Sequence, residues 1–327
     1  MRFRFTASSL LAASLIASTA LAQATAAPAK PAPPQDPKPA TPAAPAAPAA
    51  PAAPETLPPP PPPPPAAPAG PALKEIKFEG EKPSAKELFQ KHLDATGGAA
   101  AWEPKLSMHA TGTIDVPSVG IAGPVEIFSM APNKMLMTMD LPGVGKTRTG
   151  FDGDTGWAID PMRGPTLMDK KEVADLRREA NFKRDLDYAK DPGDAKVVGL
   201  FEFGGKPCWQ IAVTNPGGMT TQNFYDKESG LMSGLMMRAA TPMGEIPVTI
   251  TLSDYQEFGG VKVPATAVTA VMMQTQKLTT KTVEWNTVDA KVFELPAEIK
   301  GLKDAAAKPA DAKPAAPAAP ATGKDSK

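Results

Sequence analysis

Proline is concentrated at both ends of this chain, and its distribution decides how much of the sequence can fold. Most of the 40 prolines lie in residues 23–73 and 303–327, mixed mainly with alanine. Proline donates no amide hydrogen bond, and a proline–alanine segment buries too little apolar area to offset its loss of conformational entropy. We therefore expect a disordered arm over residues 23–73 and a disordered tail over residues 303–327. Residues 74–302 remain, which is the size of one domain.

The proline-rich arm allows two interpretations. Such segments favour the extended polyproline II conformation, so the arm can be a semi-rigid spacer that contacts other envelope proteins or the cell wall. It can equally be a solubilising segment under little constraint. The sequence does not decide between the two.

Residues 1–22 have the pattern of an export signal. Arg2 and Arg4 precede an apolar run from Leu10 to Leu21, and Ala20-Leu21-Ala22 matches a small-residue cleavage site. The run is short for a membrane span, and no cysteine follows it that could be acylated. We expect a soluble protein exported to the periplasm, with an uncleaved anchor as the alternative.

The titratable residues argue against several classes of function. The 35 lysines and arginines balance the 35 aspartates and glutamates, so no nucleic-acid partner is expected. Cys208 is the single cysteine and there are two histidines, so we expect no disulfide, metal site or cofactor. No phosphate-binding loop or nucleophile elbow occurs, and we expect no enzymatic activity. A hydrolase that uses His92 or His109 is an alternative, because a triad can be assembled from distant residues.

The folded part begins with a helix and continues mainly as strands. Ser84 and Glu87 form a capping box, and Gly97-Gly98 end that helix. Beyond it, segments such as Pro247–Tyr255 alternate apolar with polar residues and are separated by glycine-containing turns. A second helix is expected over Asp169–Tyr188. These patterns predict an α+β, mainly β fold built on an antiparallel meander.

The stretch FDGDTGWAID, from Phe151 to Asp160, combines three acidic residues with a tryptophan. Asp152-Gly153 is typical of a type I′ hairpin turn. Asp152 and Asp154 also have the first spacing of a calcium loop, but Gly156 and Arg163 stand where further ligands are required. We therefore interpret the segment as a turn and not as a metal site.

Six segments resemble, in the same order, motifs of the outer-membrane lipoprotein-sorting (LolA/LolB-like) half-barrel family. They read KHLDATGGAAAWEPKLSMHATGTI, MAPNKMLMTMDLPG, GFDGDTGWAIDP, FYDKESGLMSGL, DYQEFGGVKVPATA and VFELPAE. The resemblance extends from about Ser84 to Ala297. It implies a strongly curved antiparallel sheet, or half-barrel, with helices covering its concave face and a hydrophobic cavity between them. It also implies no catalytic residues, a lipid or an acylated lipoprotein as ligand, and Arg148 as the positional candidate for a lid-locking arginine.

Methionine is unusually frequent in the predicted strands, with 15 in the chain. Met135, Met137 and Met139 share one face of a strand, and their flexible, polarizable side chains suit a surface that adapts to varied acyl chains. Ordinary core packing is the alternative for any single methionine. Further candidate ligand-binding residues are Phe128, Trp157, Leu176 and Met236. Trp157 is expected at the rim of the cavity, because it follows a turn.

These observations predict an exported protein that binds or carries lipid or lipoprotein acyl chains in the cell envelope. The alternative is a non-transporting structural or sensor module displayed on the proline-rich arm. In that case the apolar interior is only a packed core.

Overall fold

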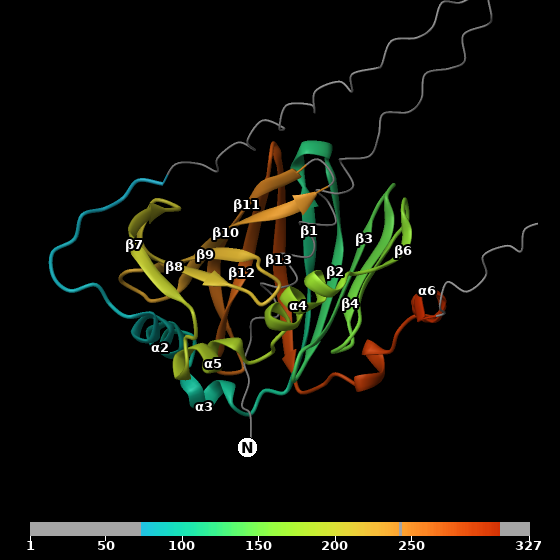
Figure 1. Cartoon of the computed structure of the whole chain (residues 1–327), viewed down its shortest axis with the longest axis horizontal. Helices are drawn as coiled ribbons and strands as arrows, with labels where there is room; N and C mark the ends of the chain where they lie inside the picture. Colours follow the sequence, from blue (N-terminus) through green and yellow to red (C-terminus); the bar gives the residue numbers. More distant parts are fainter. Residues whose placement is uncertain (1–72, 242–243, 308–327) are drawn as a thin grey trace, which may run out of the picture.

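The computed structural model describes residues 73–241 and 244–307, which form one open antiparallel sheet with helices against it (Figure 1). The expected signal peptide, residues 308–327 of the expected tail and all but the last residue of the arm lie outside these residues. The expectation of a disordered tail is wrong for residues 303–307, which belong to a helix. No helix in the described part of the chain is long and apolar enough to cross a membrane.

The sheet has thirteen strands in the order β6-β5-β4-β3-β2-β1-β13-β12-β11-β10-β9-β8-β7. The strands are β1 (Ser107–Val116), β2 (Ile121–Met130), β3 (Lys134–Leu141), β4 (Gly145–Phe151), β5 (Gly156–Asp160), β6 (Gly164–Leu167), β7 (Lys196–Phe203), β8 (Lys206–Thr214), β9 (Thr220–Asp226), β10 (Met232–Thr241), β11 (Gly244–Phe258), β12 (Val261–Val271) and β13 (Gln274–Trp285). The helices are α2 (Ala85–Ala95), α3 (Gly98–Trp102), α4 (Lys170–Glu179), α5 (Arg184–Lys190) and α6 (Ala297–Ala307), with short 3₁₀ helices η1 (Pro117–Val119) and η2 (Ala290–Phe293).

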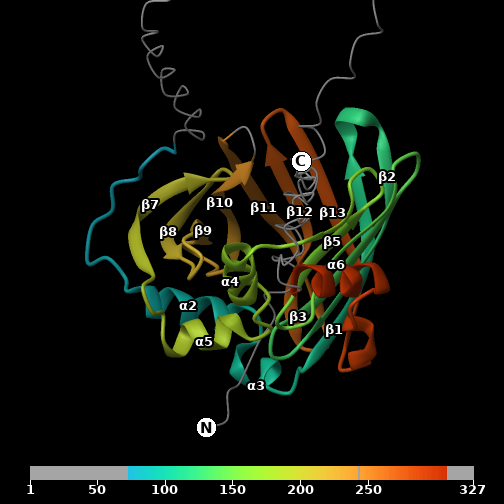
Figure 2. The ribbon, with the colours of Figure 1, turned by 45° about the vertical axis from the view of Figure 1, so that its right-hand side comes forward.

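The strand order divides the sheet into two meanders. The first runs from β1 to β6 and the second from β7 to β13, and they are joined in the middle where β1 pairs with β13. Consequently β6 and β7, which are consecutive in the chain, lie at opposite edges of the sheet. The connection between them contains α4 and α5, and α4 lies between the two arms of the curved sheet (Figure 2).

The sheet bends at glycine-containing bulges. The strand pairing shifts register at three places, which include Gly112 in β1, Gly199 in β7 and Gly234 in β10. A Cβ atom on Gly112 would lie 2.2 Å from the Thr279 carbonyl oxygen, so no larger residue fits there. Bulges increase the local twist and bend of a strand. The prediction of a curved, open antiparallel sheet is confirmed.

The helices agree with the sequence in one case and differ in another. Ser84 and Glu87 form the predicted capping box of α2. The single helix predicted over Asp169–Tyr188 is wrong, because the chain forms α4 and α5 with a break between them. At the break the Phe182 side chain is fully buried, and its amide donates a hydrogen bond of 3.0 Å to the Pro132 carbonyl oxygen. The Phe182 ring at this break belongs to the main core.

The turn predicted at Asp152-Gly153 is confirmed, although it is longer than the two-residue type I′ form. Residues 152–155 connect β4 to β5. The Asp152 carboxylate accepts hydrogen bonds from the amides of Asp154 (2.8 Å) and Thr155 (2.7 Å), and Gly153 has a φ of 108°. The carboxylate therefore stabilises the backbone of its own turn.

Apolar residues cover both faces of the sheet. The concave face, which α2, α4 and α5 cover, carries the main core, which includes Leu88, Leu176 and Leu186 from these helices. The opposite face carries a second cluster, here named the convex cluster, which consists of Leu136, Trp157, Phe293 and Ile299. Its members come from β3, β5, η2 and α6, so the C-terminal segment covers the outside of the first meander.

The edge strand β7 is covered by the start of the described chain. The amide of Ile76 donates to the Leu200 carbonyl oxygen, and the amide of Glu202 donates to the Lys74 carbonyl oxygen, both at 2.8 Å. At the other edge, α6 lies against β6. Both edges are thus shielded from pairing with a second chain.

We predict that Phe293→Ala destabilises the protein by about 3–5 kcal/mol, because it opens a cavity in the convex cluster. Phe293 is 4% exposed. The shift in the urea unfolding midpoint measures the effect, and Met273→Ala, at a side chain 97% exposed, is the control. An unchanged midpoint for Phe293→Ala would show that the C-terminal segment is not part of the fold.

Candidate ligand-binding face

Three methionines of β3 project onto the concave face. Met135, Met137 and Met139 are 1%, 2% and 5% exposed, and all three belong to the main core. Leu136, between the first two, belongs to the convex cluster. The expected alternation along this strand is therefore present, and the three methionines form one continuous row.

The neighbours of these methionines on β2 and β4 follow from the strand register. Met137 lies between Ile127 and Thr149, and Met135 is paired with Ser129 and Phe151. Directly paired residues project to the same face of a sheet. The concave face therefore combines apolar side chains with small hydroxyl residues.

Helix α4 contacts this face through Leu176, one of the predicted ligand-binding residues. Leu176 is 7% exposed and packs over Gly156 of β5. A Cβ atom on Gly156 would lie 2.7 Å from the Met168 sulfur and 3.2 Å from Leu176 Cδ2. The glycine therefore provides the space in which α4 approaches the sheet.

Polar contacts hold α4 to the turn between β4 and β5. The Arg177 guanidinium lies 3.1 Å from the Asp154 carboxylate and 5.7 Å from the centre of the Phe151 ring. Both members of the ion pair are solvent-exposed, so its contribution to stability is small.

Other polar contacts hold α4 to the opposite arm of the sheet. The Arg178 guanidinium donates a 3.2 Å hydrogen bond to the Thr214 carbonyl oxygen, and the Asn215 side chain donates one of 2.8 Å to Glu179. Burial raises the pKa of the Asp175 carboxyl, and the amides of Gly217 and Met219 only partly offset this effect. Helix α4 is therefore connected to both arms of the sheet.

A buried ion pair joins α4 to α5. Arg184 Nη1 donates to Glu179 Oε2, and both side chains are less than one-tenth exposed. Burial alone would lower the pKa of Arg184, but the neighbouring Glu179, Tyr188, Asp185 and Tyr225 together outweigh it and raise that pKa above its ordinary value. Separating the members of this buried pair is costly, because each would leave the other's charge without compensation.

His92 lies beneath these helices and not in an accessible site. Its Nδ1 lies 3.1 Å from the Gly230 carbonyl oxygen, its Nε2 lies 4.0 Å from Asp185 Oδ2, and its ring contacts Tyr225. Burial lowers the pKa of His92, while the Asp185 carboxylate partly opposes this shift. The other histidine, His109, lies on the opposite face of the sheet.

The remaining predicted ligand-binding residues lie away from the methionine row. Trp157 is 2% exposed in the convex cluster, and Phe128 packs against that cluster with its ring stacked on His109 at 4.3 Å. Met236 packs against a third cluster that contains Phe203, Cys208 and Phe224. The structure thus brings together Met135, Met137, Met139 and Leu176, and it places Phe128, Trp157 and Met236 elsewhere.

Arg148, the positional candidate for a lid-locking residue, does not face α4. It pairs with Thr138 and Ile159, and its guanidinium lies 5.4 Å from the centre of the Trp157 ring. It therefore lies on the convex side of the sheet. The arginines that hold α4 are Arg177, Arg178 and Arg184.

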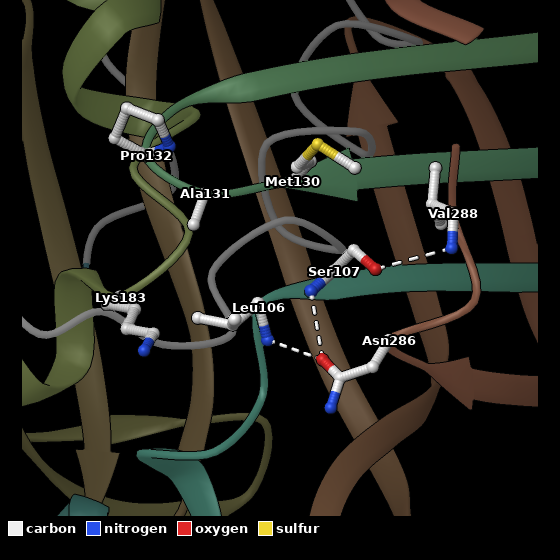
Figure 3. Close-up of a pocket in the computed structure, with 8 residues that line it drawn as sticks. All are labelled: Leu106, Ser107, Met130, Ala131, Pro132, Lys183, Asn286 and Val288. Atoms are coloured by element: carbon white, nitrogen blue, oxygen red, sulfur yellow. Dashed lines mark hydrogen bonds between the residues drawn. The ribbon is translucent and has the colours of Figure 1, made fainter. Parts of the chain in front are cut away.

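A separate pocket of about 580 Å³ opens beside the start of β1 (Figure 3). Its lining residues are Leu106, Ser107, Met130, Ala131, Pro132, Lys183, Asn286 and Val288. Asn286 Oδ1 accepts hydrogen bonds from the amides of Leu106 (2.6 Å) and Ser107 (3.3 Å), as Figure 3 shows. Lys183 Nζ donates to the Glu103 carbonyl oxygen at 3.0 Å. These groups join neighbouring segments, and no predicted ligand-binding residue lines the pocket.

Cys208 is buried and lies 3.4 Å from the Ser233 hydroxyl. Burial raises the pKa of its thiol, which disfavours the nucleophilic thiolate. Within residues 73–241 and 244–307, no group of three His, Cys, Asp or Glu side chains could hold a metal ion.

The sequence reasoning missed two polar residues of the concave face, Ser129 and Thr149. Strand alternation alone places Ser129 on the same face as Ile127, so the sequence pattern was sufficient to assign Ser129 to the concave face. Neither hydroxyl has a hydrogen-bond partner among the described residues, and only the three-dimensional structure shows this.

No protein-family model matches the chain, and no curated protein matches it. Among solved structures, a LolA superfamily protein from Nitrosomonas europaea aligns over 65% of this chain and 99% of its own, with 10% identity and a TM-score of 0.45. A DUF1329 family protein from Desulfovibrio piger aligns over 65% and 97%, with 12% identity and a TM-score of 0.46. A domain described as a candidate outer-membrane lipoprotein-sorting protein, from Vibrio parahaemolyticus, aligns over 64% and 95%, with 12% identity and a TM-score of 0.43.

These likenesses concern the fold alone. At identities of 10–12% and TM-scores below 0.5, they are no evidence of a shared ligand or activity.

We predict that Gly156→Val loosens α4, because the added methyl groups overlap the space that Met168 and Leu176 occupy. Proteolysis of the folded protein within α4 should become faster. Gly301→Val, at a glycine of α6 that has no left-handed φ and no atom within 4 Å of an added Cβ, controls for glycine replacement in general. Equal cleavage of both variants would contradict the role of Gly156.

We predict that the free energy of unfolding decreases as the pH falls below about 6.5, the pKa of an unfolded histidine. Burial lowers the pKa of folded His92, so the unfolded chain binds the proton more tightly and gains stability as the pH falls. His92→Asn keeps a donor for Gly230 and should flatten the dependence between pH 7.5 and 5.5. His109→Asn is the matched histidine replacement, and an equal flattening in both variants would contradict the assignment to His92.

Proposed function

We propose that this protein is an exported envelope protein that binds lipid or lipoprotein acyl chains on the concave face of its half-barrel. The single observation that carries this proposal is the row of Met135, Met137 and Met139 on the concave face, against which a helix with few apolar anchors packs at β5. The proposal places the protein in the periplasm, because residues 1–22 have the pattern of an export signal.

The methionine row suits a ligand of variable shape. Methionine has three rotatable side-chain bonds and a polarizable sulfur, so it fills irregular apolar spaces and tolerates different partners. Each methylene group that an acyl chain buries contributes about 0.8 kcal/mol. A long chain therefore binds tightly without directional contacts, provided that the face can open.

Helix α4 meets that condition. Its apolar contacts with the core come from Val173 and Leu176, with Ala180 at its C-cap, and most of its other residues are charged. Elements with few buried apolar contacts open at low free-energy cost. Movement of α4 would expose the methionine row to a ligand.

A second candidate is a non-transporting structural or sensor module, in which the concave face is only a core. The observation that favours it is the low exposure of the three methionines, which is 5% or less. This reading requires no ligand and no movement of α4.

Native mass spectrometry of the purified protein, before and after organic extraction, distinguishes the two candidates. We expect co-purifying lipid or acylated peptide, whose removal lowers the melting temperature through the loss of ligand stabilisation. A protein that is free of lipid as purified, and that takes up no fatty-acid or lipopeptide probe, would favour the structural module.

We predict that the triple variant Met135→Leu, Met137→Leu, Met139→Leu folds but binds a narrower range of acyl chains. Leucine keeps the volume and removes the flexibility, so each exchange costs less than about 1.5 kcal/mol. The distribution of bound chains, measured by mass spectrometry, gives the readout. The control is Met272→Leu with Met273→Leu, at an exposed hairpin tip. An unchanged distribution in the triple variant would contradict the role of the methionine row.

A further inference from the structure

Two buried hydroxyl groups of the first meander have no hydrogen-bond partner. Ser129 is 0% and Thr149 is 2% exposed, and neither Ser129 Oγ nor Thr149 Oγ1 has a partner in the described part of the protein. By register, Ser129 lies beside Met108 and Met135, and Thr149 lies beside Met137. Both hydroxyls therefore belong to the methionine-bearing part of the concave face.

An unpaired buried hydroxyl is costly, by about 1–3 kcal/mol. The buried hydroxyl of Thr96, in contrast, is hydrogen-bonded. Thr96 Oγ1 lies 3.0 Å from the His92 carbonyl oxygen and accepts a hydrogen bond from the Trp102 indole. Alanine or valine at positions 129 and 149 would serve a passive core better.

Water is a poor partner for these hydroxyls. A buried water molecule needs two to four polar neighbours. Beside Ser129 the paired residues on both neighbouring strands are methionines, and beside Thr149 they are Met137 and Ala158. A ligand that is mainly apolar but carries hydrogen-bond acceptors matches this arrangement.

We infer that the concave face binds a diacylglyceryl group, whose two ester carbonyls accept hydrogen bonds from Ser129 and Thr149. The two residues are on β2 and β4, with β3 between them, and Ser129 is in register with Met135 while Thr149 is in register with Met137. Two strand spacings and a two-residue offset along the strands therefore separate their backbones by about 12 Å. Each hydrogen bond contributes about 2.8 Å, and two acceptors several ångströms apart can therefore reach both hydroxyls. A fatty acid carries its oxygens at one end and satisfies at most one hydroxyl.

This inference rests on the proposed function and narrows its ligand. Phospholipids and the diacylglyceryl cysteine of a lipoprotein share the same diester chemistry. The structure specifies that shared chemistry, and the experiment separates the two sources.

The test compares a diester ligand with its diether analogue, which keeps both chains but lacks the carbonyl oxygens. The delipidated full chain is titrated with a short-chain diacyl phosphatidylcholine, its diether counterpart, and a synthetic diacylglyceryl lipopeptide. We expect the wild-type protein to bind the diester roughly tenfold more tightly than the diether, as expected for one to two net hydrogen bonds. Whichever of phosphatidylcholine and the lipopeptide binds with the higher affinity shows whether the diacylglyceryl group comes from a phospholipid or from a lipoprotein.

Variants assign the preference to the two hydroxyls. Ser129→Ala with Thr149→Val should remove the preference for the diester, because neither replacement can donate a hydrogen bond. Thr149→Ser keeps a hydroxyl and should retain most of the preference. Thr138→Val, on the opposite face of β3, is the matched control and should behave as wild type.

Three results would overturn the inference. Equal affinity of the wild-type protein for diester and diether would remove the role of the carbonyls but leave acyl-chain binding intact. A preference that persists in the double variant would assign it to other residues. Binding of none of the three ligands would contradict both this inference and the proposed function.

Discussion

The structure depends on one connection, the segment that joins the two edge strands of the sheet. β6 and β7 follow each other in the chain but lie at opposite edges of thirteen strands. If the sheet were flat, twelve spacings would separate these edges by roughly 57 Å. Helix α4, with 10 residues, spans roughly 15 Å, and it contacts both arms. The sheet can satisfy these contacts only by curving, and the glycine bulges allow it to do so.

The curvature gives the two faces different roles. Side chains on the convex side diverge, and the C-terminal segment covers them with Phe293 and Ile299. Side chains on the concave side converge towards α4, and there the sheet carries methionines rather than aromatic rings on β3. A rigid aromatic core would suit a passive fold as well as methionine does. The proposal of a lipid ligand explains why flexible methionines lie next to two hydroxyls that have no hydrogen-bond partner in the part of the chain that the structure describes.

Local sequence patterns predicted most strands, because alternation and glycine turns act over a few residues. They correctly placed Met135, Met137 and Met139 on one face. The same patterns could not show whether Trp157 lies on the face of these methionines or on the opposite face, because the register between the strands determines its face. Trp157 pairs with Gly150, in the same row as Leu136 and one residue away from the Met135 row. A shift of one residue reverses the face. The break between α4 and α5 was missed for a similar reason, since the burial of Phe182 is a tertiary contact.

The contacts of α4 with the two arms of the sheet differ in strength. Arg177, in the last turn of α4, contacts Asp154 of the β4–β5 turn, and their side chains are 50% and 86% exposed, so this screened pair contributes little. Glu179, the last residue of the same helix, is 5% exposed and bonded to both Arg184 and Asn215. Removing a partner from such a buried pair leaves a charge without compensation and is strongly unfavourable. Under the proposed function, α4 would therefore move away from the first meander while remaining attached to the second. The methionine row and both free hydroxyls lie on the first meander, which is the side that this movement would uncover.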